Sequence, residues 1–201
     1  MNNTGIVILA AGKSSRFGRI KQLVHFNGKT LLQHVIEEAK KAGASPILVI
    51  TGSNASEVSA SIADKTISSV FNKDWSEGMA SGIVTGVTKI NELDKSIEKI
   101  IIAVCDQPFV TAAIFEQLDQ LQKERGKHIV ASAYSNTIGT PVLFTRKYFD
   151  QLLALKGDTG AKKILETYRN DVATIDFPQG NIDIDTQKDY EKLLDEQKHV
   201  L

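Results

Sequence analysis

Short, nearly uninterrupted apolar runs recur along the chain and alternate with segments of helical periodicity. GIVILAA (5–11), PILVITG (46–52) and KIIIAVCD (99–106) are the clearest of these runs. Such runs are typical of strands that are buried on both faces of a parallel sheet. Segments such as 78–93, in which apolar residues return at helical spacing, are typical of helices that cover such a sheet. The alternation predicts an α/β fold with three layers, α/β/α, in which helices lie on both faces of a mostly parallel sheet.

The same periodicities give the remaining elements. Strands are also expected at 68–72, 128–134, 140–145 and 172–177. Helices are expected at 30–44, 55–64, 78–93, 111–126, 146–155, 159–169 and 186–197. Thr30 is expected to cap the first helix and Gly43 to end it, because these residue types are favoured at those positions. The segment 99–106 is the most apolar run, which predicts a central place in the sheet.

Length and composition limit the classes of protein to which the chain can belong. Its 201 residues suit a single domain, which we expect to span 1–201. Lys and Arg together number 24, as do Asp and Glu, so no overall charge favours nucleic acid as a partner. No apolar run approaches the roughly 20 residues that span a membrane. The single cysteine, Cys105, excludes an internal disulfide and is expected to pack as an apolar residue. The N-terminus lacks the pattern of a signal peptide, and we expect a cytoplasmic protein.

The first apolar run leads into a loop that combines glycine with positive charge, LAAGKSSRFGRIKQL. Gly12 and Gly18 allow backbone N–H groups to approach a ligand, and Ser14 adds a hydroxyl donor. Arg16 and Lys21 supply cations that suit phosphate oxygens. The loop therefore predicts a site for a nucleotide triphosphate, with an exposed basic turn as the alternative. It has neither the spacing of a Walker A motif nor that of the dinucleotide-binding G-x-G-x-x-G motif.

Acidic residues follow the most apolar run and recur near the C-terminus. Asp106 comes where that predicted strand ends, a position from which a carboxylate can hold Mg²⁺, although a turn aspartate is the alternative. Asp183 and Asp185 alternate in an extended segment and are expected on one face of it. One of them can be the second metal ligand; a capping and a solvated aspartate are the alternative. Thr186 is placed to cap the last helix.

Two further glycine-containing segments are candidates for ligand contact. In NKDWSEGMASG, Gly78 allows the close approach of a flat ring, and Ser81 offers a hydroxyl to the edge of that ring. Trp75 in the same segment is expected to pack against the loop. In LKGDTGAKKIL, a Gly-Asp-x-Gly turn precedes a helix near Lys162, where a second anion can bind. A turn followed by a solvated helix face is the alternative there.

Taken in order, these segments resemble a known family. LAAGKSSRFGRIKQL is similar to the L-A-A-G-x-S-x-R-x-G-x-x-K signature of nucleotidyltransferases that join a nucleoside triphosphate to a phosphorylated acceptor. NKDWSEGMASG, CDQPFV, GTPVLF, LKGDTGAKKIL and DIDTQKDY extend the similarity over about residues 5–193. The ordered set most closely resembles the molybdenum cofactor cytidylyltransferase branch of that family. The resemblance implies a Rossmann-like nucleotidyltransferase fold.

The resemblance also implies roles for particular residues. Arg16, Lys21 and Asp106 would be catalytic, and Asp106 with Asp185 would hold Mg²⁺. The nucleotide-binding residues implied in the same way are Leu9, Ala10, Ala11, Gly12, Ser14, Arg16, Lys21, Thr51, Gly78, Ser81 and Asp106.

The activity implied is the Mg²⁺-dependent transfer of CMP from CTP to the phosphate of molybdopterin, with release of pyrophosphate. A molybdoenzyme or its chaperone would then receive the product. A guanylyltransferase acting on the same cofactor and a sugar-phosphate nucleotidyltransferase remain open alternatives. An NAD(P)-dependent oxidoreductase is disfavoured because the chain lacks G-x-G-x-x-G. A nucleotide-binding module without chemistry is disfavoured because the chain keeps both Asp106 and Asp185.

Overall fold

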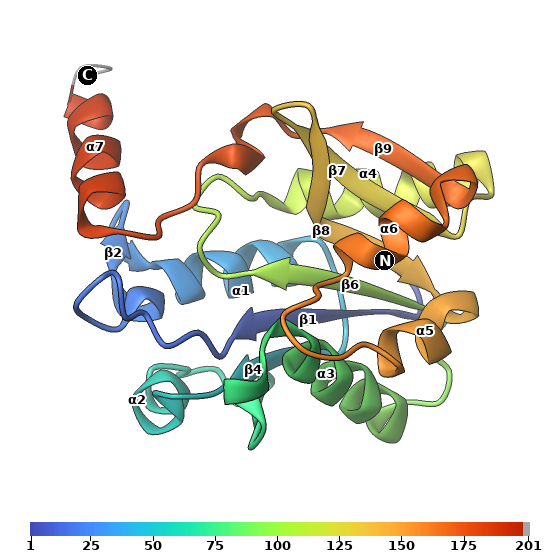
Figure 1. Cartoon of the computed structure of the whole chain (residues 1–201), viewed down its shortest axis with the longest axis horizontal. Coiled ribbons are helices and arrows are strands. Elements are labelled where there is room, and N and C mark those ends of the chain that lie inside the picture. Colours follow the sequence, from blue (N-terminus) through green and yellow to red (C-terminus); the bar gives the residue numbers. More distant parts are fainter. Residues whose placement is uncertain (199–201) are drawn as a thin grey trace.

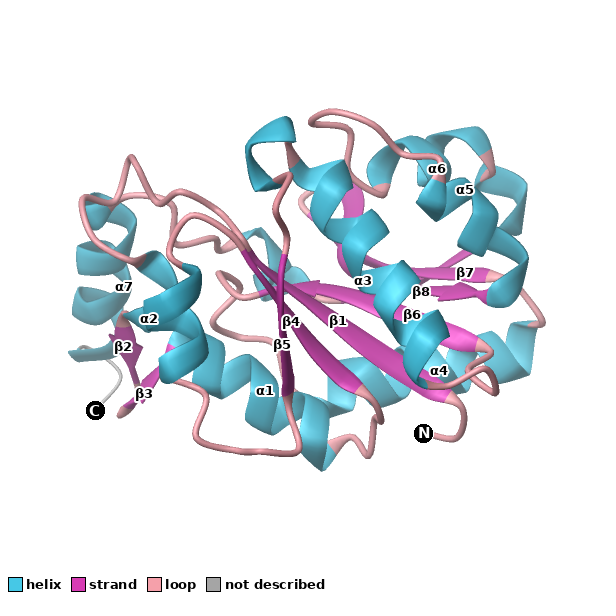
Figure 2. Ribbon diagram, turned by 90° about the horizontal axis from the view of Figure 1, so that it is seen from below, coloured by secondary structure: helices cyan, strands magenta, loops and turns pink. Residues whose placement is uncertain are grey.

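A computed structural model of the protein describes residues 1–198, and within them seven strands form one sheet. Their bounds are β1 Thr4–Ala10, β4 Ile47–Thr51, β5 Ser68–Phe71, β6 Lys99–Val104, β7 Ile129–Tyr134, β8 Thr137–Thr145 and β9 Val172–Asp176. The strand order is β5-β4-β1-β6-β8-β7-β9. Every neighbouring pair is parallel except the two that involve β8. The mostly parallel sheet is confirmed, and β6 has the predicted central place (Figure 2).

β8 runs against its neighbours because a tight hairpin joins it to β7. Ser135 and Asn136 form the connection, and both have positive φ, 46° and 60°. A two-residue connection of this kind suits an antiparallel pair, whereas parallel neighbours need a longer crossover. On its other side β8 pairs antiparallel with β6. The sequence predicts both strands of the hairpin, and the structure adds that they run in opposite directions.

Helices cover both faces of the sheet, so the predicted three layers are present (Figure 1). The helices of one face are α1 (Leu31–Lys41), α2 (Ala55–Ala60) and α4 (Ala112–Arg125), and those of the other are α3 (Met79–Leu93), α5 (Phe149–Leu153) and α6 (Lys162–Thr167). Alternate residues of β1 point to the two faces: Ile6 and Ile8 belong to the core under α1 and α4, and Val7 belongs to the core under α3. Both faces of the sheet are therefore buried.

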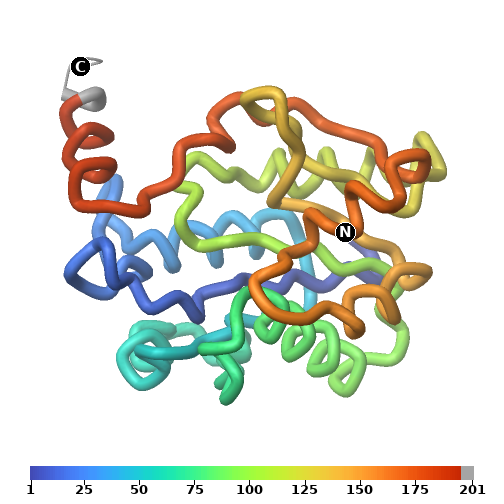
Figure 3. The backbone as a smooth tube through the Cα atoms, in the orientation of Figure 1, coloured from blue at the N-terminus to red at the C-terminus, as the bar shows by residue number. Residues whose placement is uncertain are grey.

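A third, smaller core joins segments from the two ends of the chain. The hairpin of β2 (His25–Phe26) and β3 (Lys29–Thr30), which the sequence does not predict, lies here beside α7 (Gln187–Lys198). Figure 3 shows the blue segment that follows β1 and the red segment near the C-terminus next to each other at this edge of the molecule. The buried members, which we call the flanking core, are Phe17, Val24, Phe26, Leu31, Ile184 and Leu193. The flanking core supports the basic loop on one side and the segment of Asp185 on the other.

The ends of α1 lie where the sequence predicts them. The Thr30 hydroxyl accepts a hydrogen bond from Gln33 N (3.1 Å), and the Gln33 side chain accepts one from Thr30 N (3.0 Å). This reciprocal pair satisfies two N–H groups that a helix start otherwise leaves free. Gly43 follows the end of the helix with a φ of 73°, a conformation that glycine adopts without strain.

Other helices are shorter than the sequence predicts. The chain forms 3₁₀ turns at Lys21–Leu23, Trp75–Glu77, Arg146–Tyr148, Arg169–Asp171 and Pro178–Asn181. The turn containing Gly157, which has a φ of 66°, delays the start of α6 to Lys162. Among residues 1–198, no helix combines the length and the apolar character that a membrane crossing requires.

Candidate functional site

A cavity of about 510 Å³ opens at the edge of the sheet where β1, β5 and β6 end. In α/β sheets, ligands bind outside the carboxyl ends of the strands. The lining contains six of the predicted site residues, namely Leu9, Ala11, Gly12, Lys21, Gly78 and Asp106. We call this space the strand-end cavity.

Lys21 lies between two carboxylates beside the strand-end cavity. Its Nζ donates to Asp106 Oδ2 (2.7 Å) and to Asp185 Oδ1 (2.8 Å). Burial alone would lower the pKa of Lys21, but the charge of Asp106 and the bonds to both carboxylates outweigh it and raise that pKa. The bond from Lys21 in turn lowers the pKa of Asp185. Three residues that the sequence predicts from three distant segments therefore meet at one point.

Arg16 reaches the same cluster from its outer side. Its Nη2 donates to Asp185 Oδ2 (3.0 Å), while 72% of the Arg16 side chain is exposed. Asp183 is also close, and although the residue lies at the surface, protein atoms crowd its carboxyl group. This partial burial, followed by the charges of Asp106 and Asp185, raises the pKa of Asp183 to about 6. At neutral pH three carboxylates therefore face two cations, an excess of negative charge that a bound cation would balance.

The backbone holds Asp185 beside Asp106. Ile184 N donates to Asp106 O (3.1 Å), and the Ile184 side chain is buried in the flanking core. α7 begins directly afterwards: the Thr186 hydroxyl accepts from Asp189 N (3.2 Å), and Asp189 Oδ2 accepts from Thr186 N (2.7 Å). Thr186 is thus the cap that the sequence predicts.

Gln22, which no sequence pattern singles out, organises the basic loop from beneath. Its Nε2 donates to Ala10 O (2.9 Å) and to Gly12 O (3.1 Å), and its Oε1 accepts from the Ser14 hydroxyl (3.2 Å). The Ser14 oxygen also accepts from Lys21 N (3.1 Å). Ala10 and Ser14 therefore shape the loop through these bonds rather than by lining the cavity.

Two residues of this loop have positive φ, Ser14 (54°) and Gly18 (78°), whereas Gly12 does not. The two hydrogen bonds of the Ser14 hydroxyl hold this conformation. A Cβ built on Gly12 meets no atom within 4 Å, so the missing side chain of Gly12 leaves the cavity open.

The residues predicted to lie near the base occupy different depths. Gly78 lines the cavity, but Ser81 stands behind the lining: its hydroxyl donates to Gly78 O (2.8 Å) and accepts from Asn72 Nδ2 (2.7 Å). Asn72, which no sequence pattern identifies, lines the cavity in its place. Thr51 is fully buried, and its carbonyl accepts from Asn72 N (2.9 Å). Trp75 packs against Gly52 and also contributes to the lining.

The Gly-Asp-x-Gly turn reaches the same cavity. Gly157 O accepts from Ala80 N (3.1 Å) at the start of α3. A Cβ on Gly78, whose φ is 106°, would lie 2.4 Å from Asp158 Oδ1 and 2.6 Å from Gly157 O, so only glycine fits there. Asp158 consequently lines the strand-end cavity, which the sequence does not reveal.

The carboxylates of the cluster suit a hard divalent cation. Within residues 1–198, no group of three or more His, Cys, Asp or Glu side chains has a metal-binding arrangement. Asp106 and Asp185, however, each place one oxygen within hydrogen-bond distance of the same atom, Lys21 Nζ. Because Mg²⁺ is commonly held by one or two carboxylates together with phosphate oxygens, this pair fits a cation that arrives with a nucleotide.

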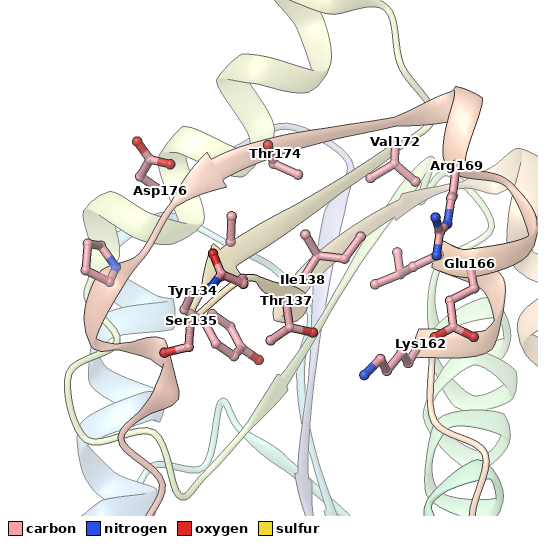
Figure 4. A pocket seen from close by; sticks show the side chains of 14 residues that line it. Tyr134, Ser135, Thr137, Ile138, Lys162, Glu166, Arg169, Val172, Thr174 and Asp176 are labelled. Carbon is pink, nitrogen blue, oxygen red and sulfur yellow. The ribbon is translucent and has the colours of Figure 1, made fainter.

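A second hollow, of about 900 Å³, lies between the β7–β8 turn, α6 and β9 (Figure 4). Lys162 extends its amino group into this hollow opposite Tyr134 and Thr137, and Arg169 stands at its far end. A smaller hollow of about 220 Å³ shares Tyr134 and Lys162 with it and shares Met79 with the strand-end cavity. We call the larger hollow the α6 groove.

Comparison with known proteins assigns the chain to a family. Residues 6–172 match the family model described as the MobA-like NTP transferase domain. The chain belongs to this family. The resemblance to a nucleotidyltransferase family is thereby confirmed.

Curated relatives of this MobA-like protein have varied names. Nicotine blue oxidoreductase of Paenarthrobacter nicotinovorans is 31% identical over 138 residues, which cover 68% of this chain and 65% of that protein. Bifunctional protein GlmU of Staphylococcus haemolyticus is 29% identical over 148 residues, which cover 72% of this chain and 31% of that protein. The chain thus spans less than two thirds of the length of these two relatives.

Solved structures with the same fold cover nearly the whole chain. The crystal structure of Rv0371c from Mycobacterium tuberculosis H37Rv has a TM-score of 0.82 at 28% identity and covers 96% of this chain and 97% of its own. Molybdopterin-guanine dinucleotide biosynthesis protein A from Archaeoglobus fulgidus has a TM-score of 0.66 at 16% identity, with 94% and 95% covered, and shows the shared fold alone. The Rossmann-like nucleotidyltransferase fold is confirmed.

Proposed function

We propose that this MobA-like protein is a Mg²⁺-dependent nucleotidyltransferase that transfers CMP from CTP to the phosphate of molybdopterin and releases pyrophosphate. The observation that carries the proposal is the position of Lys21, whose Nζ bonds both Asp106 (2.7 Å) and Asp185 (2.8 Å) beside the strand-end cavity. A cation for phosphate and two carboxylates for a metal ion thus lie together. Transfer between two anionic substrates needs this combination, because its catalysis depends on positioning and on charge stabilisation.

The triphosphate would lie along the basic loop. Lys13 and Lys21 line the strand-end cavity, and the absent side chain at Gly12 leaves room for phosphate groups. Arg16, exposed at the rim, would turn its guanidinium from Asp185 to the phosphates, where a planar fork binds two oxygens at once. Gln22 would keep the loop in the shape that these contacts require.

Asp106 and Asp185 would hold the metal ion. Mg²⁺ bound there would neutralise charge on the triphosphate and on the departing pyrophosphate. The structure of Rv0371c in complex with manganese supports a divalent cation in this fold, with a TM-score of 0.77 at 26% identity and coverage of 96% of this chain and 97% of that one. Lys21 would then share its donors between these carboxylates and a phosphate oxygen.

The reaction requires no nucleophilic side chain. An oxygen of the acceptor phosphate attacks the α-phosphorus of CTP, and the bond from that phosphorus to the pyrophosphate oxygen breaks. A phosphate monoester is largely ionised near neutral pH, so no general base is required. Cys105, the thiol beside the cavity, is buried, and this burial raises its pKa to about 12. It packs as an apolar residue, as the sequence predicts.

The α6 groove is the place where we expect the acceptor to bind. The smaller hollow connects this groove, at Tyr134 and Lys162, with the strand-end cavity, at the half-exposed Met79. An acceptor lying in the groove would present its phosphate at this junction, and the Lys162 amino group would contact an anionic part of the acceptor.

Pyrophosphate release tests the proposal when it is measured with CTP, GTP and UTP, each with and without molybdopterin. Release that requires CTP and molybdopterin together is the expected result. Release with GTP would identify a guanylyltransferase, and release with UTP and a sugar phosphate would identify a sugar-phosphate nucleotidyltransferase. CTP with Mg²⁺ at 100 times its dissociation constant should also stabilise the fold by about 2.7 kcal/mol. No release with any pair would refute the proposal.

The name of one relative favours a second candidate, an oxidoreductase, because nicotine blue oxidoreductase is 31% identical to this chain over 138 residues. Hydride transfer does not require the basic loop or the acidic cluster, and the chain lacks the dinucleotide-binding motif G-x-G-x-x-G. Titration with NADPH, followed by its fluorescence, separates the two candidates. Binding of NADPH that is tighter than that of CTP with Mg²⁺ would favour the oxidoreductase.

A further inference from the structure

Gln107 lies directly behind the carboxylate cluster and is almost completely buried, with 2% of its surface exposed. Its Nε2 donates to Gly180 O (2.7 Å) and to Thr140 O (3.2 Å). Its Oε1 accepts from the Thr140 hydroxyl (3.4 Å). One side-chain amide therefore joins three segments: the loop that follows β6, the strand β8 and the turn Pro178–Asn181.

The turn that Gln107 holds is itself closely packed. A Cβ on Gly180 would lie 2.5 Å from Tyr134 Cδ1 and 2.6 Å from Phe177 Cδ1, so the two rings leave space only for glycine. These rings pack edge to face, with centroids 6.4 Å apart. Gly180 N also donates to Phe177 O (2.8 Å). The Gly180 carbonyl is thus a fixed point to which the Gln107 amide is attached.

Two hydrogen bonds connect the segment of Asp106 to the segment of Asp185, the two carboxylates proposed to bind the metal ion. Gln107, the residue after Asp106, bonds the Gly180 carbonyl, and Ile184 N, the amide before Asp185, bonds the Asp106 carbonyl (3.1 Å). We infer that Gln107 is a positioning residue, which sets the spacing of Asp106 and Asp185 by holding the segment 180–185 against the loop after β6. That this spacing serves a divalent cation rests on the proposed function.

A purely structural role is the competing explanation, because any buried amide that loses its partners leaves carbonyl groups unsatisfied and weakens a fold. The two roles differ in where the effect of a substitution appears. A general loss of stability leaves the contacts of segment 180–185 intact in the folded protein. Loss of a positioning residue loosens that segment, and the metal ion is then held less firmly.

The test compares Gln107→Met with Tyr148→Phe in the full chain. Gln107→Met keeps the length of the side chain but removes both donors. Tyr148→Phe is the matched control: it removes a hydroxyl that donates to Asp171 Oδ2 (2.8 Å) near the start of β6, far along the sheet from the cluster. Thr140→Val, which removes the weakest of the three bonds, is the milder variant and replaces Gln107→Met should that protein not fold.

Amide hydrogen exchange reports on the segment without any ligand. We expect exchange at the Ile184 amide to rise about tenfold in Gln107→Met and about twofold in Thr140→Val, and to stay unchanged in Tyr148→Phe. Titration with Mn²⁺ alone then measures metal binding. We expect its dissociation constant to rise about tenfold in Gln107→Met and to stay unchanged in the control.

Each outcome decides the inference. Unchanged exchange at Ile184 in Gln107→Met would overturn it, even if metal affinity fell, because the segment would then not depend on Gln107. Faster exchange with unchanged Mn²⁺ affinity would overturn the link between this spacing and the metal ion. A wild-type protein that binds no Mn²⁺ would refute the metal part of the proposed function, and exchange at Ile184 would still decide the positional role of Gln107.

Discussion

A cluster of lysine and carboxylate side chains lies at each end of strand β6. We call the cluster at its start, which consists of Lys99, Asp119 and Lys123, the closed cluster because its carboxylate is buried. There Asp119, whose side chain is 5% exposed, accepts bonds from Lys99, from Lys123 (2.7 Å) and from the Thr4 hydroxyl (3.3 Å). Both carboxylate oxygens are occupied. Burial alone would raise the pKa of Asp119, but the two lysines outweigh it and keep that pKa below its usual value. The cluster ties β6 to α4.

The cluster after the other end of β6, which we call the open cluster, has more carboxylates than cations. It consists of Arg16, Lys21, Asp106, Asp183 and Asp185. Lys21 bonds both Asp106 and Asp185, Arg16 also bonds Asp185, and the Asp185 side chain is 41% exposed. Asp183 adds a further negative charge nearby. The first cluster has two lysines for one carboxylate, and its Asp119 and Lys99 side chains are only 5% and 10% exposed, which suits a structural role. The second has an excess of acid next to a cavity, which is what the proposed binding of a cation and a charged ligand requires.

Removal of Lys21 or Asp106 should give the largest effect, on activity rather than on stability. We expect Lys21→Ala or Asp106→Ala to lose on the order of 3 kcal/mol of transition-state binding, which is a fall in kcat/KM of more than 100-fold. The unfolding free energy should change by less than about 1 kcal/mol, because Lys21 keeps its bond to Asp185 when Asp106 is removed, and Asp185, which is 41% exposed, keeps its bond to Arg16 when Lys21 is removed. Pyrophosphate release and urea unfolding measure the two quantities. Turnover like that of the wild type in Asp106→Ala with Mg²⁺ present would remove this aspartate from the site.

Removal of Asp119 should have the opposite consequence. Asp119→Ala leaves Lys99 buried without its carboxylate and should lower the unfolding free energy by about 2 kcal/mol. For a chain of this length, that is a fall in Tm of roughly 4–8 °C. We expect kcat/KM at 25 °C to stay within about twofold of the wild type, since the two clusters lie far enough apart to act independently. If Asp119→Ala lost activity to the same degree as Lys21→Ala while it remained folded, the distinction between the clusters would fail.

The open cluster could be predicted from the sequence because its residues follow recognisable strands. The apolar runs fix where β1 and β6 end, and side chains placed directly after parallel strands meet at one edge of the sheet. This reasoning brings Asp106 and the loop that contains Lys21 to the same edge, although Lys21 itself lies eleven residues beyond the end of β1. Asp185 lies far from both in the chain: the alternation marks it only together with Asp183, and the resemblance singles it out. The roles of these residues in binding and catalysis stay predictions.

The closed cluster and the supporting amides could not be predicted in this way. Asp119 lies in a helix in which an aspartate is expected at the surface, and nothing in the sequence marks Lys99 as its partner. Gln22, Asn72 and Gln107 act through bonds to backbone carbonyls and side chains of other segments, and an amide that makes such bonds has no characteristic spacing. The hairpin β2–β3 is equally hidden, because two-residue strands have too few positions for a periodic pattern.

Arg16 should have a smaller effect than Lys21, because it touches the open cluster from solvent. With 72% of its side chain exposed, its contacts are screened. We expect Arg16→Ala to raise the KM for CTP about tenfold with kcat within about threefold of the wild type. Arg16→Lys should give an intermediate KM, since it keeps the charge but loses the planar fork. If Arg16→Ala and Lys21→Ala lost the same fraction of kcat/KM, the exposure of a side chain in this cluster would not determine how much it contributes to activity.

The smallest effect concerns the pH dependence of stability at the closed cluster. The pKa of Asp119 is lower in the folded protein than in the unfolded chain, so its contribution to stability is fully present above the unfolded value of about 3.9. That contribution is lost as the pH falls through the folded pKa. Urea unfolding at pH 6, 5, 4 and 3 should therefore show the wild type and Asp119→Asn differing most at pH 5 and above, with the difference shrinking by about 1 kcal/mol or less toward pH 3. Lys99→Met should flatten the same part of the curve, because it removes one of the cations that lower the pKa of Asp119. If the difference in unfolding free energy between the wild type and Asp119→Asn stayed constant over this pH range, Asp119 would stabilise the fold by hydrogen bonding alone. The contrast between the two clusters would then depend on their exposure to solvent and not on their charge.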